Sequence, residues 1–287
     1  MADENVRGYA TTDWAAEGAQ RWASQADRLE SQLLPVSEVL FSVADLQPGE
    51  RVLDIGCGRG ATTREAAIAV GAAGWATGAD VGEPLVDEAR LLGAGLSNLD
   101  FLLVDAQRHR FEQGVYDVVI SRFGVMFFDD VVDAFANIRR ALRVGGRLVA
   151  AVWQPRAASE IMSAPLQLGV SVIEQHGYSV ELPPADGGPF SLGDEARALD
   201  VLAQAGWSNA RVACHDVELY NGGPGPVANA VDVALTIGPL RALLADLPAH
   251  VTVDVRAALT DDFDRRHDGV GVRFQGGISI LTGEAAT

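Results

Sequence analysis

The stretch Arg51-Val52-Leu53-Asp54-Ile55-Gly56-Cys57-Gly58-Arg59-Gly60 decides the fold of this 287-residue chain. Its first half, 51–55, is a short apolar run that predicts a buried strand. The glycines that follow allow the backbone to turn sharply and a ligand to approach it closely. A helix is expected to follow over about 61–70. The stretch therefore predicts a strand–loop–helix unit with a binding loop in its middle.

Similar units follow along the chain up to about residue 153. Strands that alternate with helices predict a parallel sheet with helices on both faces, which is an α/β, doubly wound fold. Strands are expected at 75–80, 99–104, 115–120 and 147–153, and helices over about 84–92 and 129–142.

The flanking parts are less regular, and they predict a cover over this core. The N-terminal part reads as helical over 13–45. After the core come a helical stretch with a Pro- and Gly-rich loop (155–190), a helix (193–205), strands (210–219 and 276–282) and helical segments (227–263). We expect an N-terminal helical cover at 1–45, a ligand-binding core at 46–153, a cap insertion at 154–192, and the end of the core sheet at 193–287 with a helical insertion at about 224–265.

The charge balance excludes several functions. The formal net charge is −17, from 39 acidic against 22 basic residues, and every basic residue is arginine. Without lysine the chain cannot form a Schiff base. So negative a protein is unsuited to the phosphate backbone of nucleic acid or to an anionic membrane surface. Genomic base composition is the simplest explanation for the missing lysines, and it suggests a high-GC bacterium.

Cysteine usage and hydropathy indicate the compartment. Cys57 and Cys214 are too few for a disulfide framework or a zinc cluster, and they fit a reducing cytosol. The chain starts without the order of a signal peptide, and no apolar run is long enough to span a membrane. We expect a cytoplasmic protein without a metal site, a monomer or a homodimer.

The glycine loop alone leaves two cofactors open. Gly56-x-Gly58-x-x-Ala61 also fits a dinucleotide fingerprint, with Asp80 near the place of a ribose-binding acid. Asp54, two residues before the first glycine, would repel a pyrophosphate. A carboxylate there suits S-adenosylmethionine, whose ammonium and sulfonium groups are positive. A strand-end acid that caps the loop's amides is the structural alternative for Asp54.

Polar residues end three further strands, where open α/β sheets bind ligands. Asp80 could accept hydrogen bonds from both ribose hydroxyls, and Asp105 one from the adenine amino group, with the amide of Ala106 facing the ring. Ser121 ends the fourth strand. Each alone is more often the first residue of a loop, as an N-cap acid is. Four in this order favour S-adenosylmethionine.

These residues resemble the class I S-adenosylmethionine-dependent methyltransferases. The resemblance is specific over about 50–153. It is carried by 52–60, by Gly78-Ala79-Asp80, by Val104-Asp105-Ala106 and by 116–121. Stretches 121–128 and 141–148 are similar to the bacterial small-molecule branch, near the ubiquinone/menaquinone C-methyltransferase-like proteins. Weaker similarity continues at 188–192 and 237–240.

The resemblance implies a seven-stranded sheet with one antiparallel strand near the end. It also implies that the glycine loop contacts the methionine part of the cofactor. Val144 stands where the family usually has proline, and Gly82 where serine is common. The residues expected to bind the cofactor are Trp22, Asp54, Gly56, Cys57, Gly58, Asp80, Val81, Asp105, Ala106 and Ser121.

The methyl acceptor is expected beside the fourth strand. Methyl transfer mainly requires that the nucleophile be held close to the sulfonium carbon and that water be excluded. Arg122 could pair an acid of the acceptor or a neighbouring aspartate, and the apolar residues near it could form the pocket floor or ordinary core. His176, with Tyr178 close by, is the candidate general base. The residues expected in the substrate pocket are Trp14, Arg122, Phe123, Met126 and Phe127.

Three functions remain to be weighed. The leading one is a methyltransferase of bacterial secondary metabolism that acts on a small, apolar or ring-bearing metabolite. The second is a protein of this fold that binds S-adenosylmethionine without transferring its methyl group. The third, a nicotinamide oxidoreductase, is disfavoured by Asp54.

Overall fold

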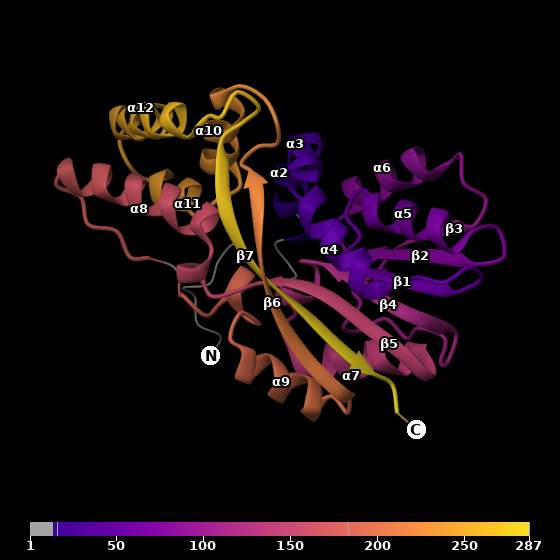
Figure 1. Ribbon diagram of the computed structural model, residues 1–287. Coiled ribbons are helices and arrows are strands. Elements are labelled where there is room, and N and C mark those ends of the chain that lie inside the picture. The colour runs from indigo at the N-terminus through magenta and orange to yellow at the C-terminus, as the bar shows by residue number, and fades with distance from the viewer. Residues whose placement is uncertain (1–13, 16, 183, 287) are drawn as a thin grey trace.

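A seven-stranded sheet organises the molecule (Figure 1). The computed structural model describes residues 14–15, 17–182 and 184–286. The strand order is β3-β2-β1-β4-β5-β7-β6; β7 runs antiparallel to β5 and β6, and the other neighbouring pairs are parallel. The expected doubly wound α/β fold, with one antiparallel strand near the end, is confirmed. The strands are β1 (Arg51–Ile55), β2 (Trp75–Asp80), β3 (Leu99–Leu103), β4 (Tyr116–Arg122), β5 (Leu142–Trp153), β6 (Ser208–Tyr220) and β7 (Arg273–Glu284).

Helices cover both faces of the sheet, as the alternating pattern requires (Figure 1). One face is covered by α4 (Leu34–Ala44), α5 (Ala61–Val70) and α6 (Glu83–Gly93), and the other by α7 (Val131–Ala141) and α9 (Glu195–Gln204). Strands β1 and β4 are almost wholly buried, because apolar side chains on both of their faces pack under these helices.

Within the residues described from position 17 onward, the N-terminal part forms three helices, where the sequence predicted helical structure over 13–45 without a break. They are α2 (Glu17–Ser24), α3 (Ala26–Gln32) and α4. Residues 1–13 lie outside the described part of the chain. Pro35 in the first turn of α4 explains the second break, because proline cannot donate the backbone hydrogen bond that would continue α3.

Strand β5 is longer than expected. The prediction placed a helix end and a Gly145-Gly146 stop before a strand at 147–153, but β5 begins at Leu142, directly after α7. Gly145 has a φ of +77°. A Cβ on Gly146 would come within 3.0 Å of the carbonyl oxygens of Arg143 and Asp117. The two glycines therefore bend the strand and do not end it.

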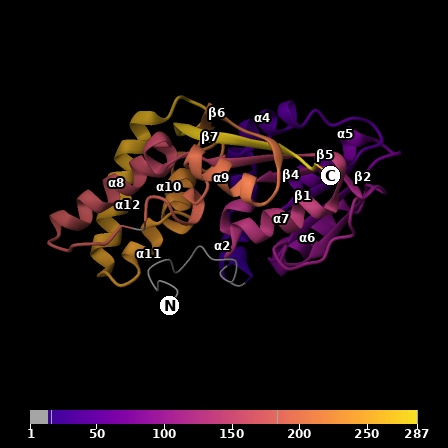
Figure 2. The ribbon, with the colours of Figure 1, turned by 90° about the horizontal axis from the view of Figure 1, so that it is seen from below.

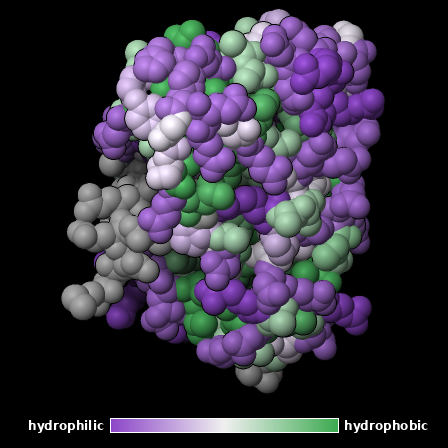
Figure 3. All heavy atoms as spheres, turned by 90° about the vertical axis from the view of Figure 1, so that its left-hand side faces the viewer, coloured by the Kyte–Doolittle hydropathy of each residue, from purple (hydrophilic) through white to green (hydrophobic). Residues whose placement is uncertain are grey.

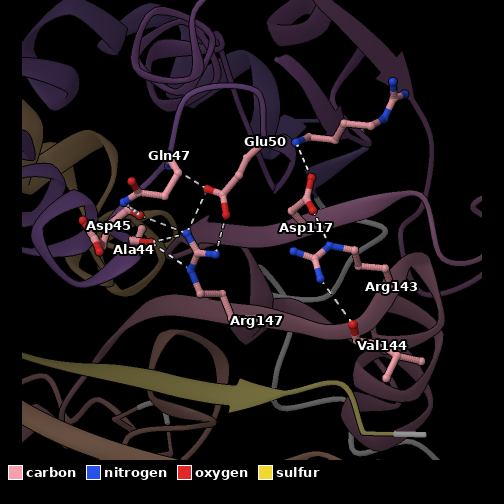
Figure 4. A network of polar contacts seen from close by, with 9 residues as sticks. Ala44, Asp45, Gln47, Glu50, Asp117, Arg143, Val144 and Arg147 are labelled. Carbon is pink, nitrogen blue, oxygen red and sulfur yellow. Dashed lines mark hydrogen bonds and ion pairs between the residues drawn. The ribbon is translucent and has the colours of Figure 1, made fainter. Parts of the chain in front are cut away.

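Arg147 of β5 connects the sheet to α4 and to the turn at 47–50 (Figure 4). Its guanidinium donates to the carbonyl oxygen of Ala44 at 2.7 Å and to both carboxylate oxygens of Glu50, at 2.7 and 2.9 Å. Nearby, Arg143 pairs with Asp117, which also accepts from the backbone N–H of Arg51. This network sets α4 against the end of the sheet remote from the strand carboxyl ends.

Four helices form a cap at one end of the sheet (Figures 1 and 2). They are α8 (Glu160–Gln175), α10 (Val227–Thr236), α11 (Leu240–Leu244) and α12 (Ala249–Arg266), and α12 packs against both α8 and α10. The two insertions expected from the sequence thus pack on each other. The face seen in Figure 3 is mainly hydrophilic, with hydrophobic residues in small patches. Among the described residues, no helix is both long and apolar enough to cross a membrane.

Candidate cofactor and acceptor site

A cavity of about 260 Å³ lies between the core, the N-terminal helices and the cap. On the core side its lining includes the loop after β1 and residues that follow β2, β3 and β4. On the cap side the lining comes from α8, α10 and α11. The carboxyl ends of the central strands therefore face the space under the cap, as expected for a ligand site in an open α/β sheet.

The loop after β1 lines the cavity with backbone rather than with bulky side chains. Gly56 and Gly58 have φ values of +69° and +54°, in the left-handed region that glycine adopts readily. The backbone N–H of Gly56 donates to the carbonyl oxygen of Ala79 at 2.8 Å, which fixes the loop against the end of β2. Gly56 also packs on Gly124, and a Cβ on either residue would come within 2.5–2.7 Å of the other's Cα.

Asp54 lies just beneath this loop and is 1% exposed. One carboxylate oxygen, Oδ2, accepts hydrogen bonds from the hydroxyls of Thr62 and Thr63 at 2.6 and 2.7 Å. The other, Oδ1, is buried and has no hydrogen-bond partner among the described residues. Burial raises the pKa of Asp54 to about 6, and the two threonine hydrogen bonds oppose that rise. Asp54 itself does not line the cavity.

Asp80 joins the glycine loop to the end of β2. Its Oδ2 accepts from the backbone N–H of Gly58 and its Oδ1 from that of Gly82, each at 2.8 Å. Burial raises the pKa of Asp80, while these backbone donors favour its charged form. Asp80 and Val81 both line the cavity. Because each carboxylate oxygen can accept a further bond, Asp80 retains capacity for a ligand hydroxyl.

Two other strand-end residues have different surroundings. Asp105 lines the cavity beside Ala106; its Oδ1 accepts from the backbone N–H of Gln107 at 2.9 Å, and its Oδ2 lies 3.3 Å from Arg108 Nε. Ser121 is fully buried and is not part of the cavity lining. Its hydroxyl donates to the carbonyl oxygen of Ile55 at 2.8 Å and accepts from the N–H of Gly124 at 3.1 Å. Ser121 thus joins the end of β4 to that of β1.

An aromatic and sulfur-containing wall follows β4. The ring of Phe123 stacks on Trp153 with centroids 4.3 Å apart and planes 9° apart. Met126, in the turn η2 (Val125–Phe127), receives a 3.5 Å hydrogen bond on its sulfur from the N–H of Trp153. Phe123 has a φ of +66°, rare for a bulky side chain, which the N–H bond to Ala151 and the stacking hold in place.

Trp14 and Trp22 cover one side of the cavity together with Phe127. The Trp14 ring lies 5.7 Å from that of Trp22 and 5.0 Å from that of Phe127, measured between centroids. All three residues line the cavity. Trp14 Nε1 is buried without a hydrogen-bond partner among the described residues. The described N-terminal residues thus contribute one side of the cavity lining.

Arg122 lies in the cavity wall without an ion pair to any described carboxylate. Its guanidinium donates to the hydroxyl of Ser37 at 2.7 Å. Burial lowers its pKa, and the charges of Asp54, Glu30 and Glu65 oppose that change. The sequence left two possible partners for Arg122, an acid of the acceptor or a neighbouring aspartate. No described aspartate forms an ion pair with it.

His176 lies outside the cavity lining. It follows the last turn of α8, where its Nε2 is 2.9 Å from Asp254 of α12 and its ring contacts that of His250. Tyr178 is likewise absent from the lining. Packing of the two insertions on each other turns this segment toward α12, a tertiary contact that the sequence does not reveal. Cys57 lines the cavity, but its thiol is buried beside Phe101, and burial raises its pKa, so it stays protonated.

Several residues that line this site were not predicted from the sequence, among them Arg59, Trp153, Gln32 and Asn221. Arg59 lines the cavity and is 9% exposed; it pairs with Asp27 of α3 and Glu88 of α6, each at 2.7 Å. Its position inside the glycine loop was a usable signal. The position of Trp153 at the end of β5 was a second usable signal, because ligands bind at the carboxyl ends of strands in such sheets. Gln32 and Asn221 carry no local signal, because the fold alone brings them to the cavity.

Comparison with known proteins gives one family. The profile described as "Methyltransferase domain" matches residues 53–150. The nocamycin O-methyltransferase of Saccharothrix syringae is 31% identical over 192 residues, 64% of this chain and 69% of that protein. The aklanonic acid methyltransferase DauC of Streptomyces sp. (strain C5) is 36% identical over 129 residues, 44% of this chain and 59% of that protein. A ubiquinone/menaquinone biosynthesis C-methyltransferase UbiE of Ectopseudomonas mendocina is 36% identical over 112 residues, which are 38% of this chain and 44% of that protein.

The solved structures agree on the fold. The YcgJ protein of Bacillus subtilis superposes with a TM-score of 0.57 at 15% identity, covering 88% of this chain and 98% of that one. The match extends well beyond the profile, to the strands and helices after residue 150. At that identity the likeness concerns architecture.

Proposed function

Because the chain belongs to the class I S-adenosylmethionine-dependent methyltransferases, we propose that it transfers a methyl group from this cofactor to a small, apolar or ring-bearing metabolite. One observation carries the proposal: the cavity beside the glycine loop continues into a largely apolar space under the cap. The polar end suits the cofactor and the apolar end suits the acceptor. Bacterial secondary metabolism and a cytoplasmic location are part of the proposal; the first is supported by the nocamycin and aklanonic acid relatives.

The residues present fit the cofactor. The buried, unpartnered Oδ1 of Asp54 is a hydrogen-bond acceptor behind the cavity lining, which an ammonium group would satisfy through a bridging water. Asp80 would hold the ribose hydroxyls and Asp105 the adenine amino group. Gly56 and Gly58 leave room for close approach to the loop, Cys57, Val81 and Ala106 supply the wall, and Trp22 covers it. Ser121 would act indirectly, by holding β4 against β1.

When bound, the cofactor supplies a methyl group activated by its positive sulfur. The protein's own residues would orient the acceptor and exclude water. Phe123, Met126 and Phe127 line the side of the cavity that follows β4, with Trp14 packed on Phe127. Arg122 would hold an anionic group of the bound ligands, because its charge has no ion-pair partner among the described carboxylates.

The proposal requires no histidine base. His176, the expected candidate, pairs with Asp254 outside the cavity. An acceptor that is itself nucleophilic near neutral pH, such as a phenolate or a carboxylate, needs only to be placed. We therefore expect His176→Ala to keep both cofactor affinity and turnover.

The test is incubation with methyl-labelled S-adenosylmethionine and a panel of phenols, carboxylic acids and quinols, with S-adenosylhomocysteine as the measured product. Asp80→Ala should weaken S-adenosylhomocysteine binding in calorimetry about 5- to 100-fold, the cost of unpaired hydroxyl partners. Asp87→Ala, an exposed acid on α6, is the matched control and should not change the affinity.

Two outcomes would contradict the proposal. Tight binding of S-adenosylhomocysteine without turnover of any acceptor would favour a protein that binds the cofactor without methyl transfer. Binding of NADH instead would overturn the cofactor assignment.

A further inference from the structure

We propose that the side chains of Gln32 and Asn221 together recognise an oxygen atom of the methyl acceptor by hydrogen bonding to it. The proposal rests on the proposed function and specifies its substrate class. Both residues line the cavity, and both are nine-tenths or more buried, at 8% and 4% exposure. They come from segments far apart in the sequence, α3 and the loop after β6.

Asn221 has an amide group without a protein partner. Its backbone N–H donates to the carbonyl oxygen of Val272 at 2.9 Å, which continues the pairing of β6 with β7. Its side chain makes no hydrogen bond with any other described residue. The amide atoms are not among the fully enclosed polar atoms without a partner, so they reach the cavity. A ligand that fills the cavity leaves this amide unpaired unless it forms hydrogen bonds with it, and such a loss is unfavourable.

Gln32 presents a donor whose direction is fixed. Its Oε1 accepts a 2.8 Å hydrogen bond from the backbone N–H of Gly222. Because an N–H must meet the oxygen and not the nitrogen of the amide, this contact assigns the two amide atoms. The remaining Nε2 group makes no hydrogen bond within the described part of the chain. Gln32 therefore offers N–H donors, which select a ligand that presents an oxygen acceptor.

The neighbourhood defines the rest of the ligand. The cap side of the same cavity is lined mainly by apolar side chains, among them Ile161 and Leu166 of α8, Val233 of α10 and Ile237, which directly follows α10. Two amides among apolar groups suit a ring-bearing body that carries a carbonyl or a phenolic oxygen. A purely hydrocarbon surface would leave both amides unpaired, and the pair would reject it.

A structural role for the same residues predicts a different pattern. Docking of the loop on α3 uses the N–H of Gly222 and Gln32 Oε1 and the close packing of Gly223 on Arg28 and Ser31. None of these contacts uses the side chain of Asn221. If the side chain of Asn221 stabilises the fold, replacing it should lower the stability of the protein. If it serves to bind a ligand, a similarly shaped apolar residue should leave the stability of the ligand-free protein unchanged or raise it, because no amide is then left unpaired.

The test compares 9-fluorenone with fluorene, which has the same ring skeleton without the oxygen. Calorimetry on the protein saturated with S-adenosylhomocysteine should show at least tenfold tighter binding of the ketone. Gln32→Glu keeps a side-chain oxygen that accepts from the N–H of Gly222 but replaces the amide N–H donors, so it should abolish the preference for the ketone. Asn221→Leu should abolish this preference too. Gln167→Glu, an exposed change on α8, is the control and should keep it.

Two further readouts separate this proposal from others. Asn221→Leu should leave the affinity for S-adenosylhomocysteine unchanged and keep or raise the melting temperature of the ligand-free protein. A lower melting temperature, equal binding of ketone and hydrocarbon, or no binding of either would overturn the proposal. Failure to bind S-adenosylhomocysteine would instead overturn the proposed function, since the ketone preference can also be measured without it.

Discussion

At the scale of single residues, the site keeps acidic groups in surroundings that oppose their charge. Asp54 is fully buried under the glycine loop, with one carboxylate oxygen satisfied by two threonines and the other without a partner. Asp80 is held by two backbone N–H groups beside it. Burial raises the pKa of both, so each favours a positive or donor-rich ligand. The negative charge of these two buried groups therefore lowers the stability of the folded protein relative to neutral side chains in the same places.

The stability of the ligand-free protein should show this cost as a function of pH. The pKa of Asp54 rises from 3.8 to about 6 on folding, so the folded state holds its proton more tightly. By linkage, the Asp54 carboxyl lowers the free energy of unfolding as pH rises from 3.8 to about 6, and above about pH 6 this decrease is complete. Asp54→Asn should raise the free energy of unfolding at pH 8 by about 1–3 kcal/mol, with the gain vanishing near pH 4.

Urea unfolding between pH 4 and pH 8 measures this, with Asp87→Asn as the exposed control. The same Asp54→Asn change should weaken S-adenosylhomocysteine binding, because a negative charge beneath the loop that would hold the ammonium group is lost. A constant difference between variant and parent over the whole pH range would show that Asp54 is not the group that titrates.

At the scale of elements, the glycine loop and the turn after β4 are built against each other. Gly124 has an ordinary φ of −77°, so its need for glycine is steric and not conformational. A Cβ there would lie 2.4 Å from the carbonyl oxygen of Ile55 and 2.7 Å from the Cα of Gly56. The N–H of Gly124 also donates to the hydroxyl of Ser121. The loop that would hold the cofactor and the turn that begins the acceptor wall therefore move together.

Gly124→Ala should displace the glycine loop. We expect the affinity for S-adenosylhomocysteine to fall at least tenfold and the free energy of unfolding to fall by about 1–3 kcal/mol, the range for overpacking. Calorimetry and denaturant unfolding measure the two effects. Gly95→Ala is the matched control, since a Cβ there meets nothing within 4 Å. Unchanged binding in Gly124→Ala would mean that the loop tolerates the displacement.

At the scale of the whole molecule, the two insertions and the last strand meet at Arg266. Its guanidinium pairs with Glu160 of α8 at 2.7 Å and with Asp262 of its own helix at 2.8 Å, and lies 4.6 Å from the ring centroid of Phe274 in β7. Glu160 also accepts from the N–H of Gln275 at 3.3 Å. These contacts connect the cap to the sheet, and the cap forms one wall of the cavity (Figure 1).

Arg266→Ala should loosen the cap while the core sheet stays intact. The pair is partly exposed, so we expect a modest loss of about 1 kcal/mol, mostly from packing on Phe274. Hydrogen exchange should rise in α8 and α12 and stay unchanged in β1 and β4. Arg265→Ala is the control, because this neighbour is 69% exposed and pairs only with Asp262 among the described residues. Equal exchange in both variants would exclude this role for Arg266.

Most of the core could be read from the sequence because its signals are local. Strand β1 and helix α5 lie at the expected residues, since an apolar run, a glycine loop and helix-forming residues follow one another directly. The break before α4 and the early start of β5 were missed. The break before α4 depends on how the helices pack over the sheet as well as on Pro35. The early start of β5 depends on a pair of glycines that bend the strand, while its pairing with β4 and β7 keeps it in the sheet.

The sequence by itself determined the α/β fold and the acids at successive strand ends, because parallel strands place their carboxyl ends at one edge. Only the tertiary structure decided which residues share the cavity. Packing of α8 on α12 takes His176 away to Asp254, and docking of the loop after β6 on α3 brings Asn221 next to Gln32. These contacts join segments more than seventy residues apart. No local pattern encodes them, because their energy comes from surfaces that exist only after folding.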